Sequence, residues 1–200
     1  MQQPEPNIQQ LFYRIKEGDK AAFNILFRLQ YETILGFAKS YLGDTRKAGE
    51  VVSDLFVWLW LNRERIDGID SPEIYLFKSV KNRCLNALRN NNKVVPIDEQ
   101  PLPVQPSTDD TPLSLIEHKE LSARLHTLIK NLPAQQRQVF KMIKESGLTA
   151  RQTAKILDLS QRTVETHLYK AVKKLEEEIS LYLGYSPCRK QMKKILAVLW

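Results

Sequence analysis

Apolar residues recur at intervals of three and four along the first part of the chain, which is the pattern of amphipathic helices. Asp19 is suited to cap the second of these segments and Gly43 to end it, while Ser71 followed by Pro72 is a typical helix start. The pattern predicts four helices, over residues 8–17, 20–42, 46–63 and 73–91. They are expected to form one compact unit over residues 5–93.

The periodicity is interrupted between residues 94 and 112, where five prolines stand among polar residues. That composition predicts an extended, flexible Pro-rich linker. The helical pattern returns over a second domain, residues 113–183, with helices expected over 113–130, 134–145, 150–157 and 161–183. The tail over 184–200 is either a loosely packed terminus or, from Pro187 onward, a short helix that docks a partner or folds back on the second domain. Because the chain shows no strand pattern, the fold class is all-α, with two small helical domains.

The net charge of +7 is unevenly distributed. Residues 1–93 carry 14 Lys and Arg against 11 Asp and Glu, residues 94–117 carry no basic and five acidic residues, and residues 118–200 carry 16 basic against seven acidic residues. A strongly basic second domain behind an acidic spacer favours a polyanionic partner such as nucleic acid, although an ordinary basic surface would have the same composition.

Several functional classes find no support in the sequence. Cys84 and Cys188 do not have metal-ligand spacing, and the three histidines lie singly, more as surface residues than as ligands. No P-loop, GxSxG or HExxH motif is present. We therefore expect a non-enzymatic protein without a cofactor, a metal or a small-molecule substrate. The chain has no signal-peptide pattern and no apolar run long enough to span a bilayer, so a cytoplasmic location is expected.

The spacing of caps, turn and apolar residues over residues 149–175 is typical of a helix-turn-helix motif. Thr149 and Gln152 can form a capping box, a tight turn leads to Ser160 as a second cap, and one apolar seam continues from Val164 to Leu175. The opposite face of the second helix carries side chains suited to reading duplex DNA: Ser160, Gln161, Arg162, Thr163, Glu165, Thr166, Tyr169, Lys170 and Lys173. The alternative is an amphipathic bundle helix whose outer face is merely solvated.

Two further surfaces lie in the first domain. The fourth predicted helix presents polar and aromatic side chains that could follow a single-stranded backbone and stack on bases: Tyr75, Lys78, Lys81, Asn82, Arg83, Asn86 and Arg89. The third predicted helix carries a strip that could form a protein-docking ridge: Glu50, Ser53, Asp54 and Val57. Trp58, on this helix, is expected to be deeply buried.

These residues resemble the extracytoplasmic-function sigma factors over roughly residues 10–92 and 118–178. The opening Gly18 to Phe23 is similar to that of the family's second sigma domain, and Ala48 to Trp60 resembles its polymerase-binding helix. The run from Tyr75 to Arg89 resembles the helix that engages the melted minus-ten element. Leu132-Pro133, Gln138 to Phe140 and Thr149 to Leu175 resemble the fourth sigma domain, which binds the minus-thirty-five element.

The resemblance implies that the chain binds core RNA polymerase and promoter DNA, both duplex and melted, and that an anti-sigma factor masks these surfaces. The loop from about Arg65 to Pro72 would be placed to capture a flipped base. Ser53, Tyr75 and the run Glu165-Thr166-His167 depart from the family's usual residues. Two other hypotheses stay open: a response-regulator-type activator, which would need an α/β receiver domain, and a helical adaptor that binds only protein.

Overall fold

A computed structural model describes residues 7–66, 68–90 and 123–184, and these residues form helices and short connections with no strand among them. The chain divides into two compact units, Met1–Gln100 and Pro101–Trp200, and the division falls within the predicted linker. The linker over 94–112 and the tail over 185–200 lie outside the described residues, as does the first part of the helix expected over 113–130. The all-α fold class is confirmed.

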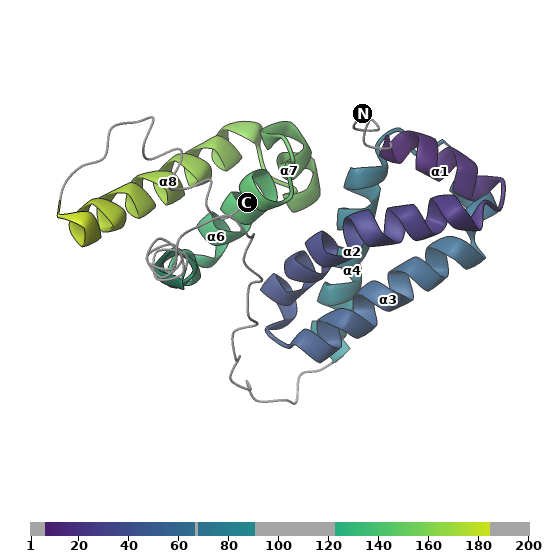
Figure 1. The fold of residues 1–200 in the computed structure, drawn as a ribbon, viewed down its shortest axis with the longest axis horizontal. Helices are drawn as coiled ribbons and strands as arrows, with labels where there is room; N and C mark the ends of the chain where they lie inside the picture. Colours follow the sequence, from purple (N-terminus) through teal and green to yellow (C-terminus); the bar gives the residue numbers. More distant parts are fainter. Residues whose placement is uncertain (1–6, 67, 91–122, 185–200) are drawn as a thin grey trace, which may run out of the picture. The chain divides into compact units, whose positions relative to one another are not determined.

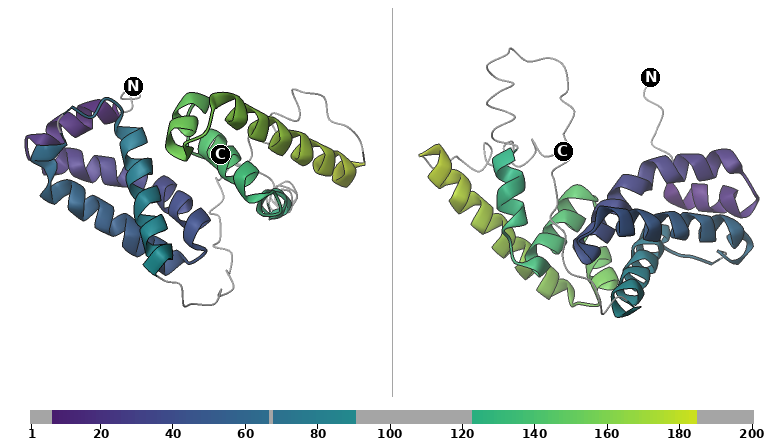
Figure 2. Two further views of the ribbon diagram at one scale, coloured as in Figure 1. Left: turned by 180° about the vertical axis from the view of Figure 1, so that it is seen from behind. Right: turned by 90° about the horizontal axis from the view of Figure 1, so that it is seen from below.

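Four long helices build the first unit: α1 (Ile8–Lys16), α2 (Lys20–Leu42), α3 (Thr45–Leu61) and α4 (Pro72–Asn90), with a short 3₁₀ turn, η1 (Arg63–Arg65), after α3. Helix α2 packs against α1, α3 and α4, and the view from behind shows α4 crossing α2 and α3 (Figure 1, Figure 2). Helix α3 ends two residues before its predicted end, where both the backbone amide and the side-chain amide of Asn62 donate to the carbonyl of Trp58.

Aromatic side chains hold the first unit together. Phe56 on α3 lies with its ring centroid 4.9 Å from that of Phe27 and 6.3 Å from that of Phe23, both on α2. Phe77 on α4 packs edge-on against Phe37 of α2 at 5.0 Å. Phe56 and Phe77 are fully buried, so their burial and the edge-to-face geometry fix how α3 and α4 lie on α2.

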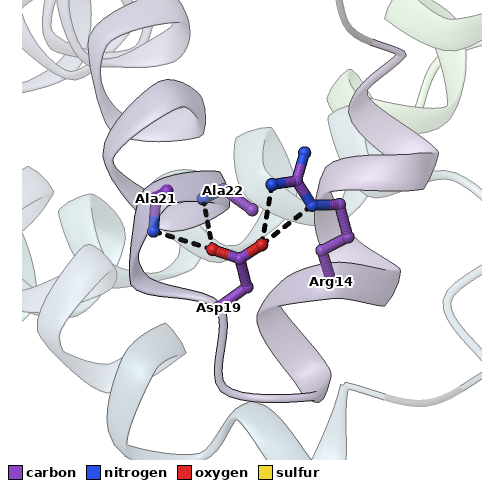
Figure 3. Close-up of polar contacts among 4 residues, drawn as sticks. All are labelled: Arg14, Asp19, Ala21 and Ala22. Atoms are coloured by element: carbon purple, nitrogen blue, oxygen red, sulfur yellow. Dashed lines mark hydrogen bonds and ion pairs between the residues drawn. The ribbon is translucent and has the colours of Figure 1, made fainter.

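Asp19 joins α1 to α2, as the capping pattern predicted. One carboxylate oxygen accepts hydrogen bonds from the amides of Ala21 and Ala22 at 2.8 and 3.1 Å, and the other lies 2.7 Å from the guanidinium of Arg14 (Figure 3). Together these bonds hold the pKa of the Asp19 carboxyl below its ordinary value of 3.8. The hydrogen bond from Ala22 has the largest effect on this pKa, and the bond from Arg14 has the next largest. Asp44 caps α3 in the same way through Lys47 and Arg46, and its pKa is lowered too.

The caps predict a pH-dependent loss of stability. Because the folded pKa of both aspartates lies below the unfolded value, their contribution is present above about pH 4 and is lost as the pH falls through the folded pKa. Asp19→Ala should lower the midpoint of thermal unfolding at pH 7, since the amides of Ala21 and Ala22 lose their acceptor. Asp19→Asn, which keeps the cap, should change it less and should flatten the decline between pH 5 and pH 2. Identical pH profiles for the wild type and Asp19→Asn would contradict this role.

The second unit contains a helix over residues 123–130, then α6 (Ala134–Phe140), η2 (Lys141–Glu145), α7 (Ala150–Leu157) and α8 (Gln161–Leu183). One buried cluster joins the helix over 123–130 and α6 to the second half of α8, and includes Leu125, Phe140 and Leu175. A second cluster, Val139, Ala154 and Val164, joins α6 and α7 to the first half of α8. The other helices of this unit thus pack against α8.

The helix predicted over 134–145 is present but changes its winding. Residues 134–140 are α-helical, and η2 continues as a wider π-helix that ends where the amide of Ser146 donates to the carbonyl of Lys141. Gly147 follows with φ of +64°, a left-handed conformation that favours glycine. Apolar spacing alone does not distinguish an α-helix from a single wide turn, so the sequence did not reveal this feature.

Candidate nucleic-acid and protein interfaces

The outer face of α3 combines acidic and apolar side chains. Glu50, Ser53, Asp54 and Val57 are all exposed, as the docking-ridge hypothesis requires. Glu50 accepts from Arg46 one turn earlier at 2.8 Å, which leaves the strip anionic chiefly at Asp54. Val57 and Leu61, one turn apart, are 57% and 70% exposed. The end of α3 therefore presents an accessible apolar surface.

Trp58 is not deeply buried, and that prediction is wrong. Its side chain is 37% exposed, and the guanidinium carbon of Arg83 on α4 lies 5.9 Å from the ring centroid. Successive helical residues are about 100° apart, so Trp58 lies between the buried stripe of Leu55 and Leu59 and the exposed one. Trp58 therefore extends the exposed apolar patch of Val57 and Leu61, which we call the α3 ridge.

The exposed face of α4 carries the predicted basic and amide side chains. Lys78, Asn82, Asn86 and Arg89 are exposed at spacings of four, four and three residues, so they form one stripe along the helix. Lys81 is half-buried beside it. A single nucleic-acid strand that runs along α4 could contact these donors one after another. Binding its phosphate backbone requires cations and amides, but no fixed arrangement of them.

Two other predicted residues of α4 form a neighbouring stripe that contacts the rest of the unit. Tyr75 is half-buried, with its ring edge against Phe12 of α1 at 6.4 Å, and burial raises the pKa of its hydroxyl. Arg83, two turns later, is half-buried over Trp58. The structure thus separates the predicted set into an open stripe and a pair fixed by neighbouring helices. Arg83 directly connects the α4 surface to the α3 ridge.

The helix-turn-helix geometry is formed as the caps predicted. The Thr149 hydroxyl accepts from the amide of Gln152 at 3.2 Å, and the Gln152 side chain accepts from the amide of Thr149 at 2.9 Å, so the capping box is complete. Asp158 ends α7 in the left-handed region with φ of 57°, and the Ser160 hydroxyl caps α8 by accepting from the amide of Thr163 at 3.0 Å. Val164, fully buried between α7 and α8, holds the second helix against the first.

Removing the capping box should loosen the motif without touching its outer face. Thr149→Ala deprives the Gln152 amide of its acceptor, and N-cap losses of this kind cost about 1 kcal/mol. Thr149→Ser keeps the hydroxyl and is the matched control. Denaturant unfolding of the full chain measures the difference, and equal stability of the alanine and serine variants would show that the cap contributes nothing.

The first turns of α8 present the predicted reading face. Ser160, Gln161, Arg162, Glu165, Thr166, Tyr169, Lys170 and Lys173 are exposed, and Thr163 is half-buried. Gln161 donates to the Glu165 carboxylate at 2.8 Å, and Thr166 donates to the carbonyl of Arg162 at 2.8 Å. Within the described residues, the guanidinium of Arg162 has no hydrogen-bond partner. Gln161 and Glu165, in contrast, would have to break the hydrogen bond between them to reach bases. Arg162 is consequently the best-placed side chain for a base edge.

Further along α8, Lys173 lies 3.8 Å from the Glu177 carboxylate, and Tyr169 is 67% exposed. His167 is half-buried. Its Nδ1 and the hydroxyl of the fully buried Thr153 have no hydrogen-bond partner within the described part of the chain. His126 is exposed, and His118 lies outside the described residues.

Two family models match the chain, one in each of the two compact units. Sigma-70 region 2 matches residues 26–94, which contain most of α2 and all of α3 and α4. Sigma-70 region 4 matches residues 122–175, which contain the helix-turn-helix. The chain belongs to the sigma-70 family. Curated relatives place this sigma factor in the extracytoplasmic-function group of that family.

Three curated relatives match most of the chain. The sigma-E factor of Haemophilus influenzae is 24% identical over 86% of this sigma factor and 94% of the relative. The sigma-H factor of Pseudomonas aeruginosa is 23% identical over 86% and 93%, and the sigma factor RpoE of Cereibacter sphaeroides is 25% identical over 81% and 88% of the respective chains.

Two solved structures share the fold. CnrH, in complex with the cytosolic domain of CnrY, matches with a TM-score of 0.56 and 20% identity over 86% of this sigma factor and 97% of CnrH. The sigma factor RpoE in complex with the anti-sigma factor NepR, from Bartonella quintana, matches with a TM-score of 0.53 and 20% identity over 79% and 96% of the respective chains. Among the described residues of the present structure, no helix is long and apolar enough to cross a membrane.

The family assignment decides between the hypotheses of the sequence analysis. A response-regulator-type activator is wrong for this sigma factor, because residues 7–66 and 68–90 form helices where an α/β receiver would need strands. Sequence reasoning missed Trp58 and Leu61 as members of the α3 ridge. The available signal was that both lie off the main apolar stripe of α3.

Proposed function

We propose that this sigma factor binds core RNA polymerase and directs promoter-specific initiation, with the first unit docking on the polymerase and holding the melted minus-ten strand while the second reads the minus-thirty-five duplex. The observation that carries the proposal is the presence, in one chain, of an exposed apolar and acidic ridge beside a basic helix face, followed by a capped helix-turn-helix motif. Neither an adaptor nor a simple DNA-binding protein needs all three.

The α3 ridge is the proposed polymerase contact. Val57, Trp58 and Leu61 offer an apolar centre, and Glu50, Ser53 and Asp54 lie as a polar rim on the preceding turns. An apolar centre with an aromatic residue and a polar rim is the composition of energetically important protein interfaces. The polar rim alone would contribute mainly to specificity and to the rate of association.

The α4 stripe is the proposed contact to the melted strand. Lys78, Asn82, Asn86 and Arg89 supply donors along one line, and the half-exposed ring of Tyr75 is held beside them by Phe12. Because Arg83 lies over Trp58, the basic face of α4 and the α3 ridge adjoin one another. Melting then draws on the free energy of binding unstacked bases, and the protein acts as a binding factor with no catalytic step.

The N-terminal turns of α8 are the proposed duplex reader. Arg162 is suited to guanine, while Lys170 and Lys173 are suited to phosphates. Each domain alone would bind weakly, and joining the two in one chain raises the effective concentration of the second contact. An anti-sigma factor is the expected regulator, since the similar sigma factor RpoE of Bartonella quintana was solved with one.

Run-off transcription with purified core bacterial polymerase and fragmented genomic DNA of the source organism tests the proposal. We expect new discrete transcripts that disappear with Arg162→Ala or with Lys78→Ala/Lys81→Ala. Arg28→Ala on α2 and Lys130→Ala, both exposed and outside the proposed surfaces, are the matched controls. The absence of any transcript while the protein shifts duplex DNA without polymerase would contradict the sigma function, and binding to protein alone would favour an adaptor.

A further inference from the structure

A carboxylate stands in the middle of the basic reading face of α8. Glu165 is exposed one turn after Arg162, and Lys170 and Lys173 follow on the same outer face. Within the described residues, Glu165 forms no ion pair with any of these cations, although side chains three residues apart on a helix are neighbours. A surface that binds a polyanion loses affinity through such a negative charge, so the proposed phosphate contacts do not account for it.

The hydrogen-bond partner of this carboxylate is an amide. Gln161 donates from Nε2 to Oε1 of Glu165 at 2.8 Å, and both side chains are exposed. Because a carboxylate only accepts hydrogen bonds, the amide nitrogen of Gln161, and not its amide oxygen, must face Glu165. The second carboxylate oxygen, Oε2, has no partner in the described part of the chain. Glu165 therefore offers only acceptors to anything that docks on this face.

The major-groove edges of the four bases differ in their response to such an acceptor. Cytosine N4 and adenine N6 carry amino groups that donate, whereas guanine O6 and thymine O4 accept. An amino group can replace the Gln161 amide as the donor to Glu165, but a keto oxygen would face the carboxylate as a second acceptor. A carboxylate at this position consequently favours amino bases over keto bases, which is the opposite of the preference expected of Arg162.

We infer that Glu165 is a specificity-determining residue that selects cytosine or adenine in the minus-thirty-five duplex, and that Gln161 donates to its carboxylate wherever no amino group is present. Since this selection needs the first turns of α8 in the major groove, it rests on the proposed function. Arg162 and Glu165 lie one turn apart, and Cβ atoms at that spacing are about 5–6 Å apart. Base pairs rise by about 3.4 Å, so the selected base lies at, or one step from, the base pair that Arg162 reads.

Stabilisation of the helix is the alternative role for this pair of side chains. A hydrogen bond between residues four apart adds slightly to helix stability, and such an effect would leave base preference unchanged. The packing of this part of α8 comes instead from its inner face, where Val164 is buried and Leu168 contacts the same cluster. Glu165→Gln should therefore leave the midpoint of thermal unfolding unchanged while it changes base preference.

Binding of the holoenzyme to a promoter found by run-off transcription tests the inference, with each base pair of the minus-thirty-five element replaced in turn by the other three. At one position, the wild type should prefer an amino base to a keto base by about fivefold or more. Glu165→Gln, whose amide can donate as well as accept, should abolish this preference and should bind the keto-substituted duplexes more tightly than the wild type does. Glu178→Gln makes the same charge change about 20 Å further along α8 and should bind every duplex like the wild type.

Gln161→Ala tests the role of the amide separately. Without Gln161, the carboxylate has no hydrogen bond to give up, so the preference for the amino base should persist and increase. Loss of that preference in Gln161→Ala would contradict reading of the base by Glu165 itself.

The same measurements distinguish failure of this selection from failure of the proposed function. Retention of every wild-type base preference by Glu165→Gln would overturn the inference and leave duplex reading by α8 intact. A wild-type holoenzyme without a preference at any base pair of the element would contradict the proposed duplex reading, and the selection by Glu165 with it.

Discussion

Val57→Glu/Leu61→Glu is expected to weaken binding of this sigma factor to core RNA polymerase by about 30-fold or more. The two side chains are 57% and 70% exposed, so they contribute little to the core of the first unit, but they stand at the centre of the α3 ridge. Burying two carboxylates in an apolar contact removes a hot spot, and such losses amount to about 2 kcal/mol or more. Fluorescence anisotropy of labelled protein titrated with core polymerase measures the effect.

A matched variant separates a specific contact from a general effect of charge. Tyr13→Glu/Leu29→Glu introduces the same two carboxylates at positions that are 68% and 44% exposed on α1 and α2. It should bind core polymerase like the wild type, and both variants should keep the helical circular-dichroism spectrum. Unchanged polymerase affinity of the folded Val57→Glu/Leu61→Glu protein would show that the α3 ridge is not the docking surface.

Arg162→Ala and Lys170→Ala are expected to impair promoter recognition in different ways. If Arg162 contacts a base edge, its loss should weaken holoenzyme binding to the cognate minus-thirty-five element by about 5- to 150-fold and relax the preference at one base pair. If Lys170 contacts a phosphate, its loss should weaken all duplexes equally and reduce the slope of log affinity against log salt by about 0.9.

The distinction is measured by holoenzyme binding to the cognate duplex and to single-substituted duplexes at several salt concentrations. Lys130→Ala removes an exposed positive charge elsewhere in the second unit and should change neither quantity. A uniform loss of affinity across all duplexes for Arg162→Ala would contradict base reading by that residue. Its role would then be that of a phosphate contact.

Most of the helical framework could be predicted from the sequence because its signals are local. Periodicity located the helices, and the short polar side chains of Asp19, Thr149 and Ser160 indicated where several of them begin. The order of the two units and the helix-turn-helix motif followed from the same local signals. Caps of this kind depend only on residues two or three positions away, so no tertiary knowledge is needed.

The exposure of the α3 ridge could not be predicted in the same way. Helix α3 is apolar around much of its circumference, and its packing against α2 and α4, which buries Leu55, Phe56 and Leu59, decides which side is covered. Trp58 is left at the edge of that contact, where Arg83 from a helix two dozen residues later lies over its ring. Such a pair depends on how α3 and α4 cross, which no local pattern encodes. The left-handed Asp158 and the wide turn η2 were missed for a different reason, because no glycine or spacing marks them.

Permanganate mapping of unpaired thymines on a promoter identified by run-off transcription tests the division of labour between the two units most directly. With core polymerase and the wild-type protein, thymines of the minus-ten region should become reactive without nucleotide hydrolysis. With Lys78→Ala/Lys81→Ala, the upstream duplex should stay protected while this reactivity falls, and Arg28→Ala should behave as the wild type. Full reactivity with the α4 variant, or its loss together with upstream protection, would contradict the assignment of strand melting to the first unit.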